Sequence, residues 1–275
     1  MFVPDGVPLA DALARTTVVG IGAHPDDLEL GAVWGPVSCA DSRGFTGVVC
    51  TDGAGSPAAG DDVVSRRRSE QRRAAIRGGY GLMVQLGHRS QAIRTPDGRS
   101  AVVDELVTVL AGARPEVVLA HDPLDRHPSH VAAALAAIEA CRRLSPSERP
   151  ARLLGVEGWR PLGWLAGPDR VRLDVSGHDR LLRDLVACHA SEVVLKRYDL
   201  AAEGRRRANA TFDDAHGPDV AEQVVVAIDL TPLLHDVDRP VGTFVAAVVE
   251  RFAAEAVATV RSLQAPERGR RPPSV

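Results

Sequence analysis

Short β-branched apolar runs alternate with longer segments of helical periodicity through the first half of the chain. Four of these runs have the length and composition of buried strands: 17–21, 45–51, 83–86 and 116–120. Apolar positions three and four residues apart predict the helices between and after them, over 28–42, 63–77, 102–110 and 131–143. This alternation predicts an α/β, Rossmann-like fold with a mostly parallel sheet and helices on both faces.

The second half follows a less regular pattern. Strand-like runs cover 152–159, 171–175 and 222–230, and helical periodicity covers 179–190, 196–208 and 241–263. We expect these segments to form an α+β part of the same unit, because no linker divides residues 1–264, which are predicted to be one domain. Residues 265–275, rich in arginine and proline, are expected to be a disordered tail.

Composition narrows the class of protein. At 275 residues, with 45% apolar and 25% charged residues, the chain can bury one full α/β core. The net charge of −3 gives no reason to expect nucleic acid or an anionic membrane as a partner. No apolar run reaches the length that a membrane span needs, and residues 1–17 lack the features of a signal peptide.

Cysteine usage bears on the compartment. Cys39, Cys50, Cys141 and Cys188 are scattered along the chain and form no C-x-x-C pair. This spacing favours free thiols in a reducing environment, so a cytoplasmic protein is expected. The sequence leaves the oligomeric state open.

The first strand runs directly into a cluster of ionisable residues. His24, Asp26, Asp27 and Glu29 lie within six positions, and a bound cation would offset the repulsion among the acids. Residues three apart share a helical face, so His24 and Asp27 can converge on one point while Asp26 is directed elsewhere. The alternative is that the adjacent aspartates only cap the following helix and favour its positive end.

A second cluster, His127 and His130, follows the strand 116–120. Carboxyl ends of parallel strands meet at one edge of a sheet, so the two clusters are expected to lie together. Two histidines and one carboxylate with an open position are typical of a catalytic zinc site, although another divalent metal such as Fe²⁺ would also fit. Spacing does not decide whether His127 or His130 is the ligand. Asp26 remains free to act as general base on metal-bound water.

These motifs resemble those of a known family. Residues 23–31, Ala-His-Pro-Asp-Asp-Leu-Glu-Leu-Gly, are similar to the signature of the LmbE-like, or PIG-L, zinc N-deacetylases, and residues 127–134 are similar to its second motif. Weaker similarity extends to residues 51–53, to Arg67-x-x-Glu70 and to residues 189–191. The resemblance implies a Rossmann-like, zinc-dependent hydrolase that removes an acyl group, usually acetyl from an N-acetylglucosamine-type amide.

The resemblance also implies roles for individual residues. The expected zinc ligands are His24, Asp27 and His130, with Asp26 as the general base. His127 is expected to stabilise the oxyanion of the tetrahedral intermediate as an imidazolium, and Arg67 to contact the substrate. Glu29 is expected to hydrogen-bond backbone or the groups that support the metal ligands.

Three departures from the family pattern affect these expectations. Ser129 stands where many relatives carry an acid, so Asp122 or Asp125 would have to hold His127 charged. The loop after Thr51 lacks a glutamate common in the family, and Glu192 stands where a glutamine is frequent.

Trp159 and Trp164 are expected to be buried rather than to stack on a sugar.

The expected partner is therefore a small N-acylated molecule whose identity the sequence does not give. Two alternatives remain open within this interpretation. One is a hydrolase of a different amide, of the thiol-conjugate amidase type. The other is a non-catalytic relative that binds metal or sugar; it would need the ligand Asp27 but not the second carboxylate, Asp26, beside it.

Overall fold

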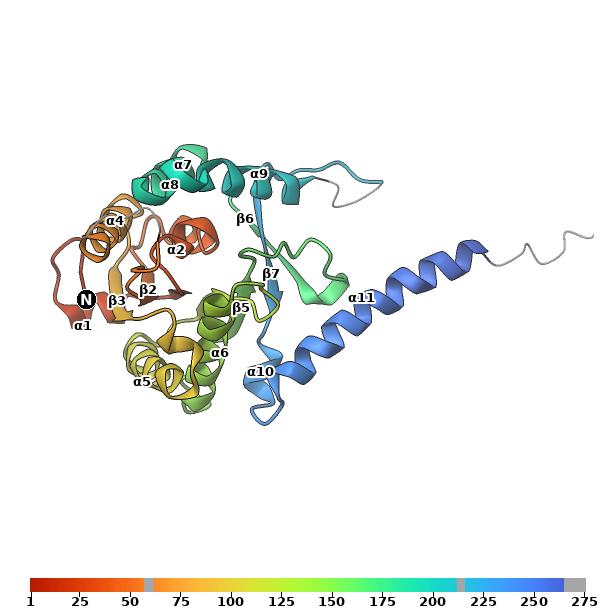
Figure 1. The fold of residues 1–275 in the computed structure, drawn as a ribbon, viewed down its shortest axis with the longest axis horizontal. Helices are drawn as coiled ribbons and strands as arrows, with labels where there is room; N and C mark the ends of the chain where they lie inside the picture. Colours follow the sequence, from red (N-terminus) through yellow and green to blue (C-terminus); the bar gives the residue numbers. More distant parts are fainter. Residues whose placement is uncertain (57–61, 212–215, 265–275) are drawn as a thin grey trace, which may run out of the picture.

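A seven-stranded sheet forms the centre of the computed structural model, which describes residues 1–56, 62–211 and 216–264 (Figure 1). The strands are β1 (Val18–Gly22), β2 (Phe45–Thr51), β3 (Leu82–His88), β4 (Val117–His121), β5 (Arg152–Val156), β6 (Arg170–Asp174) and β7 (Val224–Asp229). Their order across the sheet is β3-β2-β1-β4-β5-β7-β6. The first five are parallel, and β7 lies antiparallel to both β5 and β6. The predicted fold class is confirmed.

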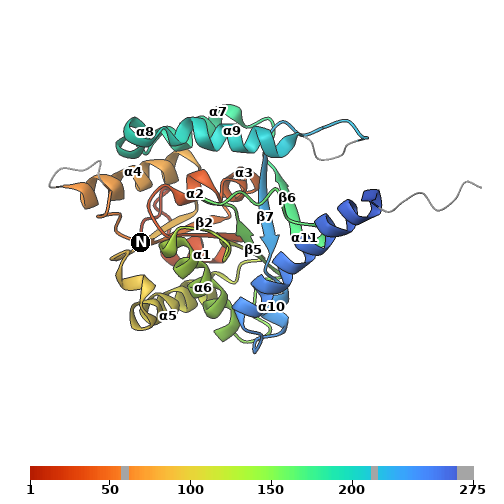
Figure 2. The same ribbon diagram turned by 45° about the vertical axis from the view of Figure 1, so that its right-hand side comes forward.

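Helices cover both faces of this sheet (Figures 1 and 2). They are α1 (Leu9–Ala14), α2 (Asp27–Leu30), α3 (Trp34–Ser38), α4 (Val63–Arg77), α5 (Pro96–Ala113), α6 (Pro128–Arg143), α7 (Asp179–Ala187), α8 (Ala190–Lys196), α9 (Tyr198–Ala210), α10 (Pro232–His235) and α11 (Val241–Gln264), with 3-10 turns η1 (Ala92–Arg94) and η2 (Gly167–Asp169). One face carries α1, α5, α6 and α10, and the other carries α2, α3, α4 and α7.

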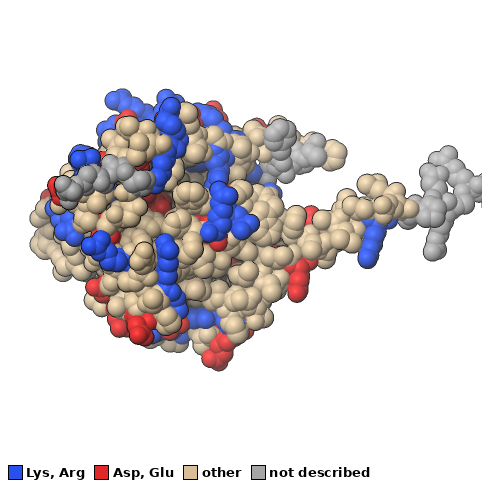
Figure 3. Space-filling view, in the orientation of Figure 1, with Lys and Arg blue, Asp and Glu red and all other residues tan. Residues whose placement is uncertain are grey.

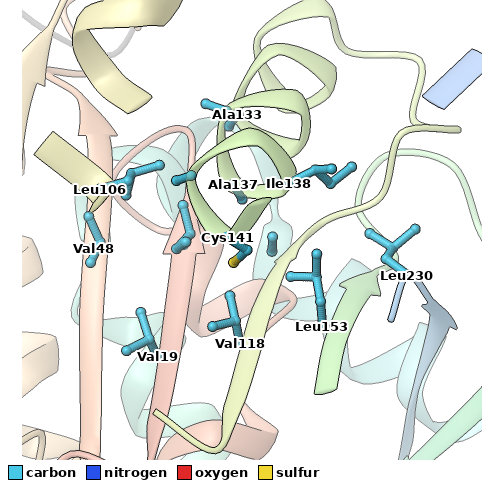
Figure 4. Packing of buried hydrophobic residues seen from close by; sticks show 14 of the residues in the cluster. Val19, Val48, Leu106, Val118, Ala133, Ala137, Ile138, Cys141, Leu153 and Leu230 are labelled. Atoms are coloured by element: carbon cyan, nitrogen blue, oxygen red, sulfur yellow. The ribbon is translucent and has the colours of Figure 1, made fainter. Parts of the chain in front are cut away.

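Small side chains set the packing on the first face. Ala137 and Cys141 of α6 are fully buried against Val19, Val118 and Leu153 of the central strands (Figure 4). Alanine keeps the helix axis close to the sheet, and close packing of this kind contributes most of the stability of such a core. The helix that carries the second histidine cluster is therefore fixed firmly to the sheet.

The predicted helix over 28–42 is wrong in one respect, because it is broken into α2 and α3. The break follows Gly31, where an added Cβ would lie 3.2 Å from the Glu157 carbonyl oxygen and 3.3 Å from Val156 Cγ2. The chain presses here against the end of β5, a tertiary contact that no periodicity reveals. Pro36, which has no N–H to donate, stands in the first turns of α3.

Two expectations concern the limits of the chain. Residues 265–275, the expected disordered tail, lie outside the described residues, and a single domain over 1–264 stays a prediction. Within the described residues, no helix combines the length and apolar character that crossing a bilayer requires.

Candidate active site

The carboxyl ends of β1 and β4 open into a pocket of about 430 Å³. Both ionisable clusters line it, as expected from strands that end at one edge of a parallel sheet. The side chains that they contribute are His24, Asp26, Asp27, His121, His127 and His130. Residues far apart in the sequence thus form one site.

The Asp27 carboxylate lies at the centre of the histidines. Its Oδ2 is 3.3 Å from His24 Nδ1 and 3.0 Å from His121 Nε2, and its Oδ1 is 3.4 Å from His130 Nε2. Among the described residues, two trios could each hold a metal: His24 with His127 and His130, and Asp27 with His121 and His130. The expected ligands His24, Asp27 and His130 draw on both trios, so that assignment stays a prediction.

His121 is the member of this cluster that the sequence did not place among the candidate ligands. It ends β4, and its Nε2 accepts a hydrogen bond of 3.1 Å from the Ala23 N–H. This bond ties the end of β1 to the end of β4. The signal available in the sequence was its position at a strand end, beside Asp122.

The donors fit a divalent metal. Burial by itself would raise the pKa of Asp27, but His130 and His121 hold that pKa well below its usual range. The buried Nδ1 atoms of His121 and His127 have no hydrogen-bond partner among the described residues. Imidazole nitrogens together with an ionised carboxylate are the donor set that zinc prefers, and carboxylate with imidazole also suits iron.

A carboxylate outside the predicted set orients His130. Asp125 Oδ2 accepts a hydrogen bond of 2.8 Å from His130 Nδ1 and another of 3.0 Å from the Trp159 N–H. Nδ1 of His130 therefore carries a proton, and Nε2 faces Asp27. Burial opposes ionisation of Asp125, but the bond to His130 lowers its pKa to about 2.

Among the described residues, no acid forms a hydrogen bond with the His127 ring. Asp125 reaches only its backbone N–H, at 3.2 Å, and the Ser129 hydroxyl accepts a bond of 2.9 Å from Arg94 Nε. Burial and the nearby His130 and His24 lower the pKa of His127 to about 4. Neither Asp122 nor Asp125 therefore bonds the His127 ring in place of the acid that Ser129 replaces, and the surroundings favour the neutral form of His127. An imidazolium at this position stays a prediction.

Asp26 lies beside the ligand trios without belonging to either. Its backbone is left-handed, with φ of 94°, and its carboxylate contacts α4. There the Arg67 Nη2 donates a hydrogen bond of 3.0 Å to Oδ2. Burial raises the pKa of Asp26 to about 6 despite the Arg67 charge. A carboxyl titrating near neutrality suits general-base chemistry, and the role stays a prediction.

Arg67 was expected to contact substrate. Its side chain lines the pocket, and it is held by the protein: it bonds Asp26 and the Pro25 carbonyl oxygen, and its Nη1 lies 3.4 Å from Glu192 Oε1. Only 5% of the side chain is exposed. The visible effect of Arg67 is to orient Asp26, and a contact with substrate stays a prediction.

A buried hydrogen-bond network supports the strained backbone of Asp26. The Asp26 N–H donates to Gln71 Oε1 at 3.1 Å, and Gln71 Nε2 donates to Glu29 Oε1 at 2.8 Å. Tyr80 donates to the same Glu29 oxygen at 2.7 Å, and His189 Nε2 lies 3.0 Å from Glu29 Oε2. The partners of Glu29 are therefore side chains outside the predicted ligand set, and a role in supporting the metal ligands stays a prediction. Gln71 was missed, although it lies four residues beyond Arg67 and so on the same helical face.

Replacing Gln71 by leucine is expected to lower the free energy of unfolding by about 1–3 kcal/mol, because the buried Asp26 N–H loses its acceptor. Urea denaturation of the metal-free protein measures this. Gln85→Leu is the matched control, since the side-chain bond of Gln85, to the Arg68 carbonyl oxygen, is exposed. Equal losses in the two variants would contradict a special role for Gln71.

Aromatic residues form the outer wall of the pocket. Trp159 is 42% exposed and lies with its ring 5.7 Å from that of His127 and 6.4 Å from that of Tyr198. The expectation that Trp159 is buried is wrong, because the chain after β5 leaves the sheet at the pocket mouth. Trp164 is half-buried, and its ring lies 5.3 Å from that of Phe252.

Comparisons with known proteins agree with this site. Residues 19–141 match the family model PIG-L, described as GlcNAc-PI de-N-acetylase. No curated protein matches the sequence. The matched residues include both histidine clusters, Asp125 and Gln71.

Three solved structures share the fold. The conserved protein TT1542 from Thermus thermophilus has a TM-score of 0.60 and 23% identity, over 76% of this chain and 93% of the other. The N,N'-diacetylchitobiose deacetylase from Pyrococcus horikoshii has a TM-score of 0.58 and 19% identity, over 77% of this chain and 83% of the other. GalB, the 4-carboxy-2-hydroxymuconate hydratase from Pseudomonas putida, has a TM-score of 0.58 and 18% identity, over 78% of this chain and 96% of the other.

Proposed function

Because the chain belongs to the PIG-L family of LmbE-like deacetylases, we propose that it is a metal-dependent amide hydrolase acting on an N-acetylated amino sugar or a similar small conjugate. Asp26 is the observation that carries this proposal: a buried carboxylate beside the metal-binding trios and outside both. A protein that only bound metal would gain nothing from a second acid held there by Arg67. The fold alone does not select the reaction, since a hydratase has it too.

The residues that would hold zinc in this proposal are His24, Asp27 and His130. His121 is the weaker candidate, because its Nε2 already accepts the Ala23 N–H. Asp125 fixes the tautomer of His130, which presents Nε2 to the centre of the site. A bound zinc ion supplies Lewis acidity, which polarises a carbonyl group and strengthens water as an acid.

Proton transfer in the proposed reaction is the work of Asp26. Its carboxylate takes a proton from the attacking water and returns it to the leaving amine. Arg67 holds one of its oxygens, and Gln71 holds its backbone. A carboxyl with a pKa of about 6 is a strong enough base to accept the proton and a strong enough acid to release it.

In this proposal, His127 donates a hydrogen bond to the oxyanion of the tetrahedral intermediate. Its pKa of about 4 means that it would do so as a neutral imidazole rather than as an imidazolium. The substrate itself would lie against Trp159 and Tyr198, whose rings offer flat faces beside His127. A pocket of about 430 Å³ has room for a sugar with a small aglycone.

A deacetylation screen tests the proposal. Zinc-loaded protein is incubated with a panel of N-acetylated amino sugars and their conjugates, and the free amine and acetate are quantified. We expect release in equal amounts from at least one compound, lost after chelation and restored by zinc. A parallel assay follows addition of water to unsaturated carboxylic acids. Turnover there, with no amine released from any amide, would replace the proposed hydrolase by a hydratase.

A further inference from the structure

The last helix, α11, leaves the body of the protein. Phe244 and Val248 are buried in the core, whereas every residue from Val249 to Gln264 is exposed. Figures 1 and 2, which differ by 45°, both show the helix projecting away from the sheet. At 1.5 Å per residue, its exposed part extends for about 24 Å.

Two contacts fix the direction of this projection. Arg251 forms an ion pair of 2.6 Å with Asp169 of η2, and the Phe252 ring lies 5.3 Å from that of Trp164. Beyond Phe252, no side-chain hydrogen bond, ion pair or ring contact joins α11 to the other residues that the structure describes. The outer half of the helix therefore has no partner within the described part of this chain.

The exposed part of α11 carries a regular apolar stripe, which we name the α11 seam. Its members recur at alternating steps of four and three residues: Val249, Ala253, Ala256, Val260 and Leu263. The charged residues of the helix stand off the seam: Glu250, Arg251, Glu255 and Arg261. Figure 3 shows the projecting helix as a largely uncharged surface. A repeat of this spacing is the one by which two helices pair along their length.

The exposure of the seam is costly for a lone helix. Leu263 is 84% exposed and Val260 is 54% exposed. Helices in proteins gain most of their stability from packing an apolar face, and beyond Phe252 this helix packs none against the residues that the structure describes. Contiguous exposed apolar surface of this kind marks an interaction site.

We propose that two copies of this chain associate through the α11 seam, with the helices antiparallel. A two-fold pair needs one self-complementary surface, and the seam supplies it with no charge to bury. Its middle members, Ala253 and Ala256, allow the two backbones to approach closely. The antiparallel direction also keeps the two globular bodies at opposite ends of the pair.

Charge favours the same direction. The acids Glu250 and Glu255 stand in the inner part of the exposed segment, and Arg261 stands near its outer end. Arg251 also stands in the inner part, but its charge is already paired with Asp169 of the same chain. Antiparallel pairing therefore brings each Arg261 toward the acids of the other copy, whereas parallel pairing would place Arg261 level with Arg261 and acid level with acid.

The test is the oligomeric state of the full chain. One chain has a mass of 29.2 kDa. Multi-angle light scattering at a protein concentration of tens of micromolar is expected to give twice that mass. Ala256→Glu, on the seam, is expected to halve that mass. Ala258→Glu is the matched control, because it makes the same change two residues away on the opposite face of the helix. Circular dichroism checks that both variants keep their helix content.

Each outcome decides the proposal. A dimer lost in Ala256→Glu and kept in Ala258→Glu supports it. A monomeric wild-type chain overturns it and leaves the seam to a different protein. A dimer that survives both changes also overturns it, because its interface would lie elsewhere on the surface. Leu263→Cys reports direction: a disulfide between the two copies at this position, at the far end of the helix, would show parallel helices and overturn the antiparallel pair.

Discussion

The Asp26→Asn variant is expected to keep its zinc and to lose about 100- to 10,000-fold of its kcat on a confirmed substrate. Asparagine preserves the size of the side chain and can still accept the Arg67 hydrogen bond, but it cannot take a proton from water. It also tolerates the left-handed backbone at this position better than alanine does. Steady-state kinetics and metal analysis of the same preparation measure the two effects.

Asp27→Asn is the comparison that gives this result its meaning. Asp27 contacts three histidines and belongs to a metal-binding trio, so its loss is expected to remove zinc and activity together. If Asp26→Asn instead lost zinc, Asp26 would be a ligand. Full activity with zinc retained would show that another group activates the water.

Replacing Asp125 by asparagine is expected to weaken zinc binding about 10- to 100-fold. The carboxylate accepts the His130 Nδ1 proton at 2.8 Å, and an amide in its place can present an N–H that would turn the imidazole or reverse its tautomer. Competition with a chromogenic chelator gives the dissociation constant for zinc.

Asp122→Asn is a matched control for that measurement. Asp122 is fully buried near Asp125, and its Oδ1 accepts a hydrogen bond from the Leu124 N–H rather than from an imidazole. Burial and the Asp125 charge raise its pKa to about 8, so Asp122 is mostly neutral at pH 7 and asparagine changes little. Equal losses of zinc affinity in both variants would mean that Asp125 acts through the loop and not through His130.

The sequence was most informative where the structure depends on local pattern. The β-branched runs gave β1, β2 and β4, and the strand-end clusters gave His24, Asp27 and the pair His127 and His130 at one edge of the sheet. Both follow from periodicity and from residues three apart, which a short window of sequence contains.

What the sequence did not reveal depends on contacts between distant segments. Gln71 bonds the backbone of Asp26 across 45 positions, and nothing near either residue indicates it. The break at Gly31 comes from contact with the end of β5. Asp125 lies two residues before the second cluster. That its carboxylate bonds the ring of His130 and not that of His127 depends on angle and distance, which spacing alone does not fix.

The walls of the pocket come from two parts of the chain that relate differently to the family. The candidate ligands, Asp26 and Arg67 all lie within residues 19–141, which match the family model. Trp159, Glu192 and Tyr198, which close the other side, lie beyond that match. The proposed reacting groups and the residues that bound the other side of the pocket are therefore separate along the chain, so the later segments can be exchanged without touching the proposed reacting groups.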